Sequence, residues 1–316
     1  MASYNILTLS EPVTDFVATT SPATINLQCG LMEDAQRKKV YAVYKAGGMP
    51  EHPYDGVRVL MTGDPLVTAV ISGLTNDTEY GVRVFVEGAY GYQTALEGAT
   101  ARATPRAGQY LGDMPDGENA ATISLKESGT DAVFVVTKHN YSESGGTLIV
   151  RRDLYDKRKF NASGSFTVYN GSDADTWVNG PYLDLFDTAI KEKLVSVAIS
   201  SYESSSVSRT LTRKGFFLAV SEVTDPSGNI VEGDRLAYFG DAQSRIKTYG
   251  GTASTWLTRT CYNGGVANLH VITATGAISN TNQLNKTHGS LPAFVLPSDM
   301  LFSITPNSDG SYSPIL

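Results

Sequence analysis

Apolar and polar residues alternate in short runs through the first third of the chain. Runs such as Ala23–Cys29 and Tyr80–Val86 are rich in Val, Ile and Tyr and are separated by Gly, Pro, Asn and Asp. This period of two, interrupted by turn-forming residues, is typical of short β-strands. The predicted strands are Pro12–Ala18, Ala23–Cys29, Val40–Lys45, Val57–Leu60, Leu66–Ile71 and Tyr80–Val86. Their spacing predicts a β-sandwich over residues 11–105.

The pattern changes in the second half, where helical spacing interrupts the strands. We expect strands over Ala121–Glu127, Asp131–Lys138 and Gly146–Asp153. Between residues 173 and 193 we expect two short helices, the first capped by Asp173 or Asp175 and the second with Pro181 in its first turn. Leu183, Phe186 and Ile190 recur at helical spacing and would pack these helices on a sheet.

Further strands are expected over Lys193–Ser200 and Lys214–Glu222, followed by a polar region from Asp241 to Ser254. The segments Ser254–Asn263 and Ser290–Pro297 then enclose a strand-like run, Ala267–Ala274, and a loop dense in Asn. The predicted fold class is therefore mainly β, with an N-terminal β-sandwich followed by an α+β domain that carries short helices. The expected division is an N-terminal extension over 1–10, the sandwich over 11–105, a linker over 106–118 that is rich in turn-forming residues, and a second domain over 119–316.

Composition and charge narrow the possible partners. The 316 residues carry a formal net charge of −7, so we expect no nucleic acid partner. No window approaches the roughly 20 apolar residues that a membrane helix needs, and the amino terminus lacks the positive charge of a signal peptide. We expect no membrane insertion. Cys29 and Cys261 lie far apart in the chain and are interpreted as two reduced thiols in different domains.

The segment Leu74-Thr-Asn-Asp-Thr-Glu-Tyr80, followed by alternating Val82, Val84 and Val86, resembles the fibronectin type III module. In that family a Leu, a Tyr six residues later and an alternating strand form a tyrosine corner. The resemblance implies that the Tyr80 hydroxyl bonds back to the backbone near Leu74 and fixes the crossover between two sheets. Ala101-Arg-Ala-Thr-Pro105 is similar to the last strand of that module, although the usual Trp of the second strand is absent. Such a module more often spaces or docks than catalyses.

The second half resembles the domain of unknown function 6273 family, which is common in phages, prophages and Gram-positive gut bacteria. Five blocks in the family's order carry the resemblance. They are Gly146–Asp153; Tyr169, Ser172, Trp177-Val-Asn179 and Phe186; Phe216–Glu222; Trp256-Leu-Thr-Arg259-Thr; and Gly289–Pro297. Leu291 stands where the family usually has Arg, and Thr258 separates Leu257 from Arg259. The family is similar in pattern to the C-type-lectin-like fold, in which a Trp block and a closing strand hold the core while loops form a binding face.

Trp256 and Leu257 are interpreted as core residues that position the site without joining it. Arg259 is either a buried structural cation paired with a carboxylate, which we prefer, or a ligand-binding group. The polar loops combine Tyr and Asn, a mixture that binding loops use for rigid contact area and adaptable hydrogen bonds. The alternative is that individual Asn residues only form turns. The predicted ligand-binding residues are Tyr249, Tyr262, Asn263, Asn268, Asn280, Asn282, Asn285 and His288.

Catalytic and metal sites find less support in the sequence. The four histidines lack metal-ligand spacing, Cys261 has no partner for formylglycine-type oxidation, and the motifs of calcium-dependent lectins do not occur. Asp173 and Asp175 could be proposed as the paired carboxylates of a glycosidase, but helix capping explains them better. We therefore expect no catalytic residues, no metal and no cofactor.

These observations and the two resemblances predict a non-enzymatic phage virion protein of the tail fibre, baseplate or head-decoration class. Its first domain would contact other virion proteins, and its second would bind a carbohydrate or protein of the host surface. We expect a homo-oligomer, because repeated weak contacts gain avidity, assembled in the host cytoplasm and located on the virion. The alternative is a purely structural virion protein whose loops contact neighbouring virion subunits.

Overall fold

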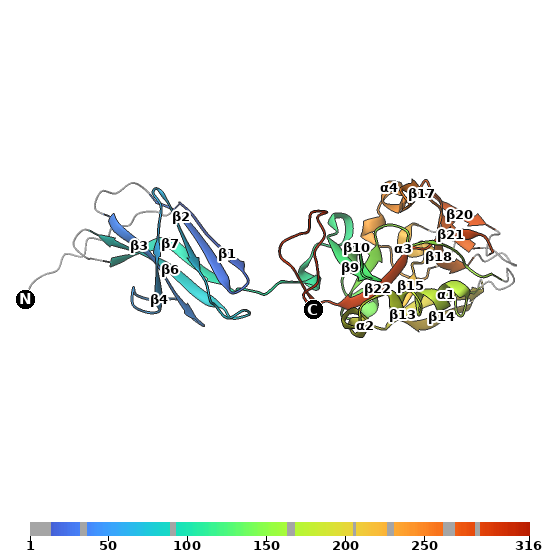
Figure 1. Ribbon diagram of the computed structural model, residues 1–316, viewed down its shortest axis with the longest axis horizontal. Coiled ribbons are helices and arrows are strands. Elements are labelled where there is room, and N and C mark those ends of the chain that lie inside the picture. The colour runs from blue at the N-terminus through green and yellow to red at the C-terminus, as the bar shows by residue number, and fades with distance from the viewer. Residues whose placement is uncertain are drawn as a thin grey trace, which may run out of the picture. The chain divides into compact units, whose positions relative to one another are not determined.

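The computed structural model describes residues 14–31, 37–88, 93–162, 168–204, 207–225, 231–261, 269–281 and 285–316. Two compact units divide the chain, one up to Gly108 and one from Gln109 onward. Both units are mainly β, and the second also contains short helices, as the sequence predicts (Figure 1).

The described residues of the first unit form seven strands in two antiparallel sheets. The sheets have the orders β1-β2-β5 and β4-β3-β6-β7. Alternating residues of both sheets, among them Ile25, Ala69 and Val82, are buried in one apolar core. The strands are β1 (Thr14–Ser21), β2 (Thr24–Gly30), β3 (Arg37–Ala46), β4 (Val57–Met61), β5 (Leu66–Ile71), β6 (Tyr80–Gly88) and β7 (Gln93–Ala103).

Tyr80, at the start of β6, makes the backbone contact that the sequence predicts. Its buried hydroxyl accepts a hydrogen bond of 3.0 Å from the Thr75 N–H, next to Leu74. The Tyr80 ring packs edge-on against Tyr44 of β3, with the two ring centroids 6.1 Å apart. This arrangement fixes the turn before β6 to the sheet that follows it.

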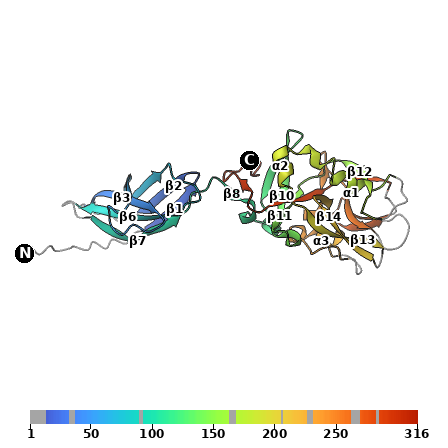
Figure 2. The ribbon, with the colours of Figure 1, turned by 90° about the horizontal axis from the view of Figure 1, so that it is seen from below.

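The second unit is built around two five-stranded sheets, with the orders β15-β22-β11-β10-β9 and β12-β21-β18-β19-β20. Three strand pairs, β13-β14, β16-β17 and β8-β23, complete its β structure. Figure 2 shows the short helices distributed around the sheets. The strands are β8 (Gln109–Tyr110), β9 (Thr122–Glu127), β10 (Thr130–Lys138), β11 (Gly146–Arg151), β12 (Lys157–Lys159), β13 (Val197–Ser204), β14 (Val207–Arg213), β15 (Gly215–Phe217), β16 (Thr248–Tyr249), β17 (Thr252–Ala253), β18 (Trp256–Cys261), β19 (Leu269–Ile272), β20 (Ile278–Thr281), β21 (Thr287–Gly289), β22 (Pro292–Pro297) and β23 (Leu301–Phe302).

The helices of the second unit are all short. The α-helices are α1 (Asp173–Val178), α2 (Thr188–Lys193), α3 (Val220–Val223) and α4 (Ala242–Arg245). The 3₁₀ helices are η1 (Leu111–Asp113), η2 (Gly117–Asn119), η3 (Tyr141–Glu143), η4 (Leu183–Leu185) and η5 (Ala237–Phe239).

The segment predicted as a linker differs from the expectation over residues 109–118. Gln109 and Tyr110 form β8, which pairs with β23 near the carboxyl end, and the following residues form η1 and the start of η2. Leu111 and Met114 are buried in the core of the second unit. Because Leu111 and Met114 stand among turn-forming residues, the sequence pattern did not indicate that they are buried. The second unit begins ten residues earlier than the predicted boundary at 119.

The helix region also differs in its details. Ser172, rather than Asp173 or Asp175, caps α1, because its hydroxyl accepts the Asp175 N–H at 3.1 Å. Pro181 is followed by η4 only, and the next α-helix, α2, begins at Thr188. Leu183, Phe186 and Ile190 are nevertheless all buried, as the spacing predicts.

The predicted strand over Lys214–Glu222 ends at Phe217, and α3 occupies its second half. The Glu222 carboxylate accepts the Ala219 N–H at 2.8 Å and so satisfies a donor at the start of this helix. An apolar run of this length is ambiguous between strand and helix, and this local contact decides the outcome.

Replacing Tyr80 with Phe should destabilise the first unit by about 1 kcal/mol, because it leaves the Thr75 N–H without its acceptor. Chemical denaturation of the first unit measures this loss. Tyr44→Phe is the matched control, since the contact between Tyr44 and Tyr80 is made by its ring. Equal unfolding midpoints for wild type and Tyr80→Phe would contradict a stabilising role for the hydroxyl.

Candidate functional site

Arg259 lies at the centre of the second unit. It belongs to β18, of which every residue is buried, and its own side chain is 0% exposed. Its guanidinium donates to the carbonyl oxygens of Ser200 at 2.9 Å, Phe217 at 3.0 Å and Glu232 at 2.5 Å. It also donates to Glu222 Oε2 at 2.7 Å. The preferred interpretation of Arg259 as a buried cation paired with a carboxylate is confirmed.

Glu222, the partner of Arg259, is itself fully engaged. Its Oε1 accepts the Tyr141 hydroxyl at 2.5 Å, and its Oε2 accepts the Ala219 N–H. Burial alone would lower the pKa of Arg259, but the negative charge of Glu222 outweighs it and raises the pKa above its ordinary value. Burial and the same carboxylate raise the pKa of Tyr141 well above 10, so Tyr141 remains a donor. Arg259 is therefore a cation at neutral pH.

A second buried carboxylate, Glu232, lies on the other side of Arg259. It accepts hydrogen bonds from the Thr260 hydroxyl and from the Tyr202 N–H, the latter at 2.7 Å. Burial raises the pKa of Glu232, although the charge of Arg259 opposes this shift. Three chain segments, around Glu222, Glu232 and Arg259, are thus joined by polar contacts inside an apolar core.

Trp256 and Leu257 are fully buried, as predicted, and the Trp256 indole N–H donates to the Arg245 carbonyl at 2.9 Å. The block that contains these residues is structural, and any function must lie around it.

The predicted ligand-binding residues that the structure describes do not form one site. Tyr262, Asn263, Asn268 and Asn282 lie outside the described residues. Tyr249 is 42% exposed on the β16-β17 hairpin, and Asn285 is exposed just before β21. Asn280 lies in β20, where it pairs with His270, and two strands separate it from β21 in the sheet.

His288, also predicted to bind ligand, is buried in β21 opposite Arg158 of β12. Among the residues that the structure describes, none bonds to its Nε2. Burial lowers the pKa of His288, and the positive charge of Lys286 lowers it further. His288 is therefore a neutral, enclosed ring rather than an exposed loop contact.

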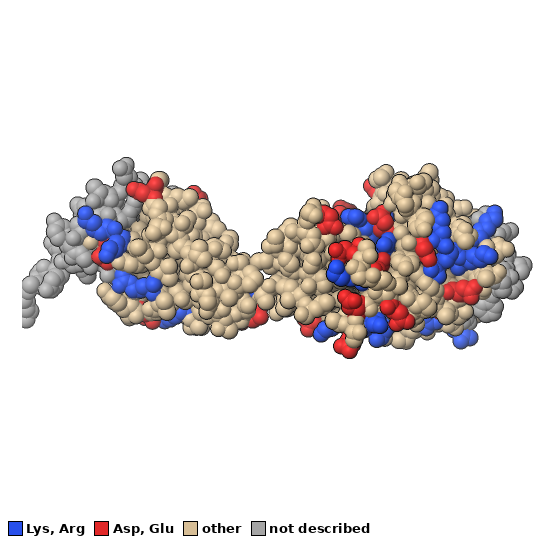
Figure 3. All heavy atoms as spheres, viewed as in Figure 1, with Lys and Arg blue, Asp and Glu red and all other residues tan. Residues whose placement is uncertain are grey.

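Three lysines lie near Tyr249, and none of them is among the binding residues predicted from the sequence. Lys157 and Lys159 are exposed on edge strand β12, and Lys286 is exposed directly before Thr287, the partner of Lys159. The Lys157 ammonium lies 5.4 Å from the centroid of the Tyr249 ring. Figure 3 shows Lys and Arg side chains gathered on this unit, over the region of β18 and β21 in Figure 1. We call Lys157, Lys159, Lys286 and Tyr249 the basic strip. Its one sequence signal was the run Lys157-Arg158-Lys159.

Arg158, between the two lysines, has a different role. Its guanidinium stacks 3.1 Å from the Trp177 ring centroid and pairs with the Asp156 carboxylate. Its charge is therefore neutralised locally, whereas in the described part of the chain no carboxylate forms an ion pair with Lys157, Lys159 or Lys286.

The two aspartates considered for glycosidase chemistry have separate structural partners. Asp175 is buried and forms two hydrogen bonds of 2.7 Å with the Arg213 guanidinium. Asp173 accepts the Ala162 N–H at 2.7 Å. In the described ranges, no three His, Cys, Asp or Glu side chains gather as they would around a metal ion. Cys29 and Cys261 are both buried, lie in different units and form no disulfide, as predicted, and burial raises the pKa of the Cys261 thiol.

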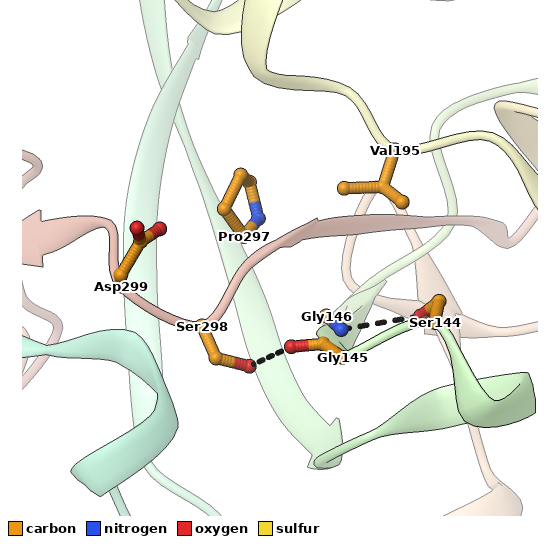
Figure 4. Close-up of a pocket in the computed structure, with 7 residues that line it drawn as sticks. All are labelled: Ser144, Gly145, Gly146, Val195, Pro297, Ser298 and Asp299. Carbon is orange, nitrogen blue, oxygen red and sulfur yellow. Dashed lines mark hydrogen bonds between the residues drawn. The ribbon is translucent and has the colours of Figure 1, made fainter.

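A pocket of about 330 Å³ lies where β11 begins and β22 ends (Figure 4). The Ser298 hydroxyl donates to the Gly145 carbonyl at 2.8 Å, and the Gly146 N–H donates to Ser144 Oγ at 3.2 Å. Behind it, Ser298 Oγ lies 2.9 Å from Thr147 Oγ1, which lies 2.9 Å from His139 Nδ1. Because Thr147 separates Ser298 from His139, the pair is not arranged as a nucleophile and its base. These bonds hold the two strand ends together.

Lys247 is a buried lysine beneath the β16-β17 hairpin. Its ammonium lies 3.1 Å from the Tyr238 hydroxyl and 4.8 Å from the centroid of that ring. Burial lowers its pKa to about 8, although Asp153 raises it and Arg152 lowers it further.

Lys247 should make the second unit more stable as the pH rises from about 8 to 9.5. Above a pKa of about 8 the folded state has lost this proton, while the unfolded chain keeps it up to its ordinary value. Over this range the free energy of unfolding should rise by about 2 kcal/mol more for the wild type than for Lys247→Met. Comparing the two proteins removes the contribution of the other titrating groups, which they share. Denaturation at both pH values measures this difference. Parallel pH profiles for the two proteins would show that Lys247 does not titrate in this range.

Arg259→Met should destabilise the second unit by roughly 3–5 kcal/mol, because it leaves the Glu222 carboxylate buried without its cation. Urea denaturation followed by circular dichroism measures the loss. The control is Arg152→Met, which removes a half-exposed guanidinium beside Asp153 and should change stability by less than about 1 kcal/mol. Similar unfolding energies for the two variants would contradict the central role of Arg259.

Sequence comparisons relate part of the second unit to a known family. The model of the family described as Domain of unknown function (DUF6273) matches residues 144–298. No curated protein matched the chain in the same comparisons. The matched region begins and ends at the pocket of Figure 4 and contains the pair between Glu222 and Arg259. Within the second unit, residues 144–298 are therefore similar to the DUF6273 family.

Proposed function

We propose that this protein is a non-enzymatic binding protein of a phage virion, of the tail fibre, baseplate or head-decoration class. Its second unit attaches to a carbohydrate or protein on the host surface through a C-type-lectin-like domain. Its first unit, a fibronectin type III-like module, contacts other virion proteins. The assembled protein is a homo-oligomer, in which several weak sites act together.

The single observation that carries the binding role is the contrast between the inside and the surface of the second unit. The polar groups of its family blocks are engaged with one another, as Arg259 is with Glu222. By contrast, the basic strip presents an exposed Tyr249 beside lysines that no described carboxylate neutralises. An aromatic face beside flexible cations is suited to binding at a surface.

The role of the first unit is supported by its architecture. Seven strands in sheets of three and four, with the hydroxyl of Tyr80 bonded to the Thr75 backbone, are what the fibronectin type III resemblance implies. The apolar side chains Leu66 and Val70 are exposed on β5, where a neighbouring virion protein would cover them. The family resemblance of the second unit supports the proposed virion location.

Attachment can be tested with fluorescently labelled protein and a panel of Gram-positive gut bacteria. We expect saturable binding to at least one strain, and Tyr249→Ala should weaken it by about fivefold or more, because it removes an aromatic contact worth about 1 kcal/mol. Tyr262→Ala, in a segment outside the described residues, tests the predicted loop directly.

The matched control is Tyr54→Ala, which removes a tyrosine that is 70% exposed on the first unit. Equal binding by wild type and Tyr249→Ala would exclude the strip from attachment. If no strain in the panel bound the protein while it assembled on particles, the purely structural alternative would be favoured.

A further inference from the structure

The basic strip has a geometry that suits an extended ligand. Residues two apart on a strand point to the same side and lie about 7 Å apart, so Lys157 and Lys159 present their ammonium groups side by side. Because β12 is the edge strand of its sheet, the next strand lies on one side only, where Lys286 adds a third positive charge. Tyr249 lies at the Lys157 end of this row.

The charge of the strip stands out against its surroundings. Lys126, Lys138 and Lys191 of the second unit each pair with a carboxylate. Lys193 and Lys214 form no ion pair among the described residues either, but Lys193 ends α2 and Lys214 lies between β14 and β15, so they do not join a row of lysines. The nearest acid in sequence, Asp156, is occupied by Arg158 and by the Ser290 hydroxyl. In a chain whose formal net charge is −7, three neighbouring lysines without a described ion-pair partner form a local positive field.

We propose that the basic strip binds the anionic groups, phosphate or carboxylate, of a charged surface glycan. This inference rests on the proposed attachment function and names the chemistry of its ligand. The ammonium groups of Lys157, Lys159 and Lys286 bind successive anionic groups as point charges. The exposed ring of Tyr249 packs against an adjoining sugar or polyol unit. A glycan offers both kinds of group in one repeating chain.

A nucleic acid also carries regular phosphates, but the observations favour a glycan. Nucleic-acid-binding proteins usually present many cations over a broad basic face. Here the chain is acidic, with a pI near 5.2, and the strip comprises three lysines and one tyrosine. Nucleic acid is therefore retained as an outcome of the test.

The full-length protein can be tested by biolayer interferometry against four immobilised polymers. Poly(glycerol phosphate) supplies phosphate, polygalacturonate supplies carboxylate, dextran is neutral, and single-stranded DNA represents nucleic acid. We expect binding to one or both anionic glycans, and this binding should weaken as salt rises from about 50 to 200 mM. The lysines displace salt cations that surround the anionic polymer, and added salt opposes this displacement. Which of the two glycans binds identifies the anionic group.

The double variant Lys157→Gln and Lys159→Gln should weaken this binding about tenfold, as two exposed charge contacts are lost. Lys157→Arg with Lys159→Arg keeps the charges and should retain binding. Lys126→Gln with Lys191→Gln, which removes two paired lysines of the same unit, should bind like the wild type. Equal circular dichroism spectra confirm that the variants fold.

Three results would overturn the inference. Tighter binding to DNA than to either anionic glycan would assign the strip to nucleic acid, and equal binding to dextran would remove the role of charge. A third result would be that the wild type and the double Gln variant attach to cells equally well and bind none of the polymers. This result would refute the role of the basic strip but would not contradict the proposed function. Loss of cell attachment by the wild type itself would instead refute the proposed function.

Discussion

One buried positive charge organises the second unit. Arg259 is completely enclosed, so its charge is tolerable only while Glu222 and the surrounding carbonyl oxygens stay in place. Those oxygens come from β13, β15 and the segment around Glu232, which are far apart in the chain. Because one guanidinium must be hydrogen-bonded entirely by protein groups, it fixes several segments in one arrangement. Its N–H groups point in fixed directions, so the acceptors must have the right orientation as well as the right distance.

Because the bonds of Arg259 lie inside the second unit, the core residues have a structural role and the surface residues are available for binding. The residues that carry the family resemblance, such as Trp256 and Phe294, are buried and pack the core. Side chains that face solvent, such as Lys157 and Tyr249, are free of that demand and can differ without disturbing the fold. A binding protein gains from such a division, because its specificity can change while its scaffold remains.

Much of the fold could be predicted because it depends on local pattern. Alternation predicted the strands of the first unit, and the resemblance to the fibronectin type III module implied the bond of the Tyr80 hydroxyl. The predictions failed where a tertiary contact of Leu111 or a local side-chain bond of Glu222 decided the outcome. Leu111, in the predicted linker, is buried in the core of the second unit. The bond from the Ala219 N–H to the Glu222 carboxylate favours the helix α3 at the end of an apolar run that was predicted to be a strand.

The candidate site was harder to predict, because proximity across a sheet is not visible in sequence. Lys159 and Lys286 become neighbours only through the pairing of β12 with β21. His288 was expected in a loop, yet strand pairing places it inside. Residue type indicated which side chains suit binding, but strand register determined which of them reach the surface together.

The pairing of Gly146 with Pro297 has a consequence for how this domain varies. A Cβ atom on Gly146 would lie 2.5 Å from Val295, so the two strands meet too closely there for any larger residue. The family match begins and ends at this junction. The chain therefore enters and leaves the matched region at two paired strand ends that must stay close together. Changes of length in exposed loops between these strands leave this junction in place, while β10 pairs with β11 from outside the matched region and ties it to the rest of the unit.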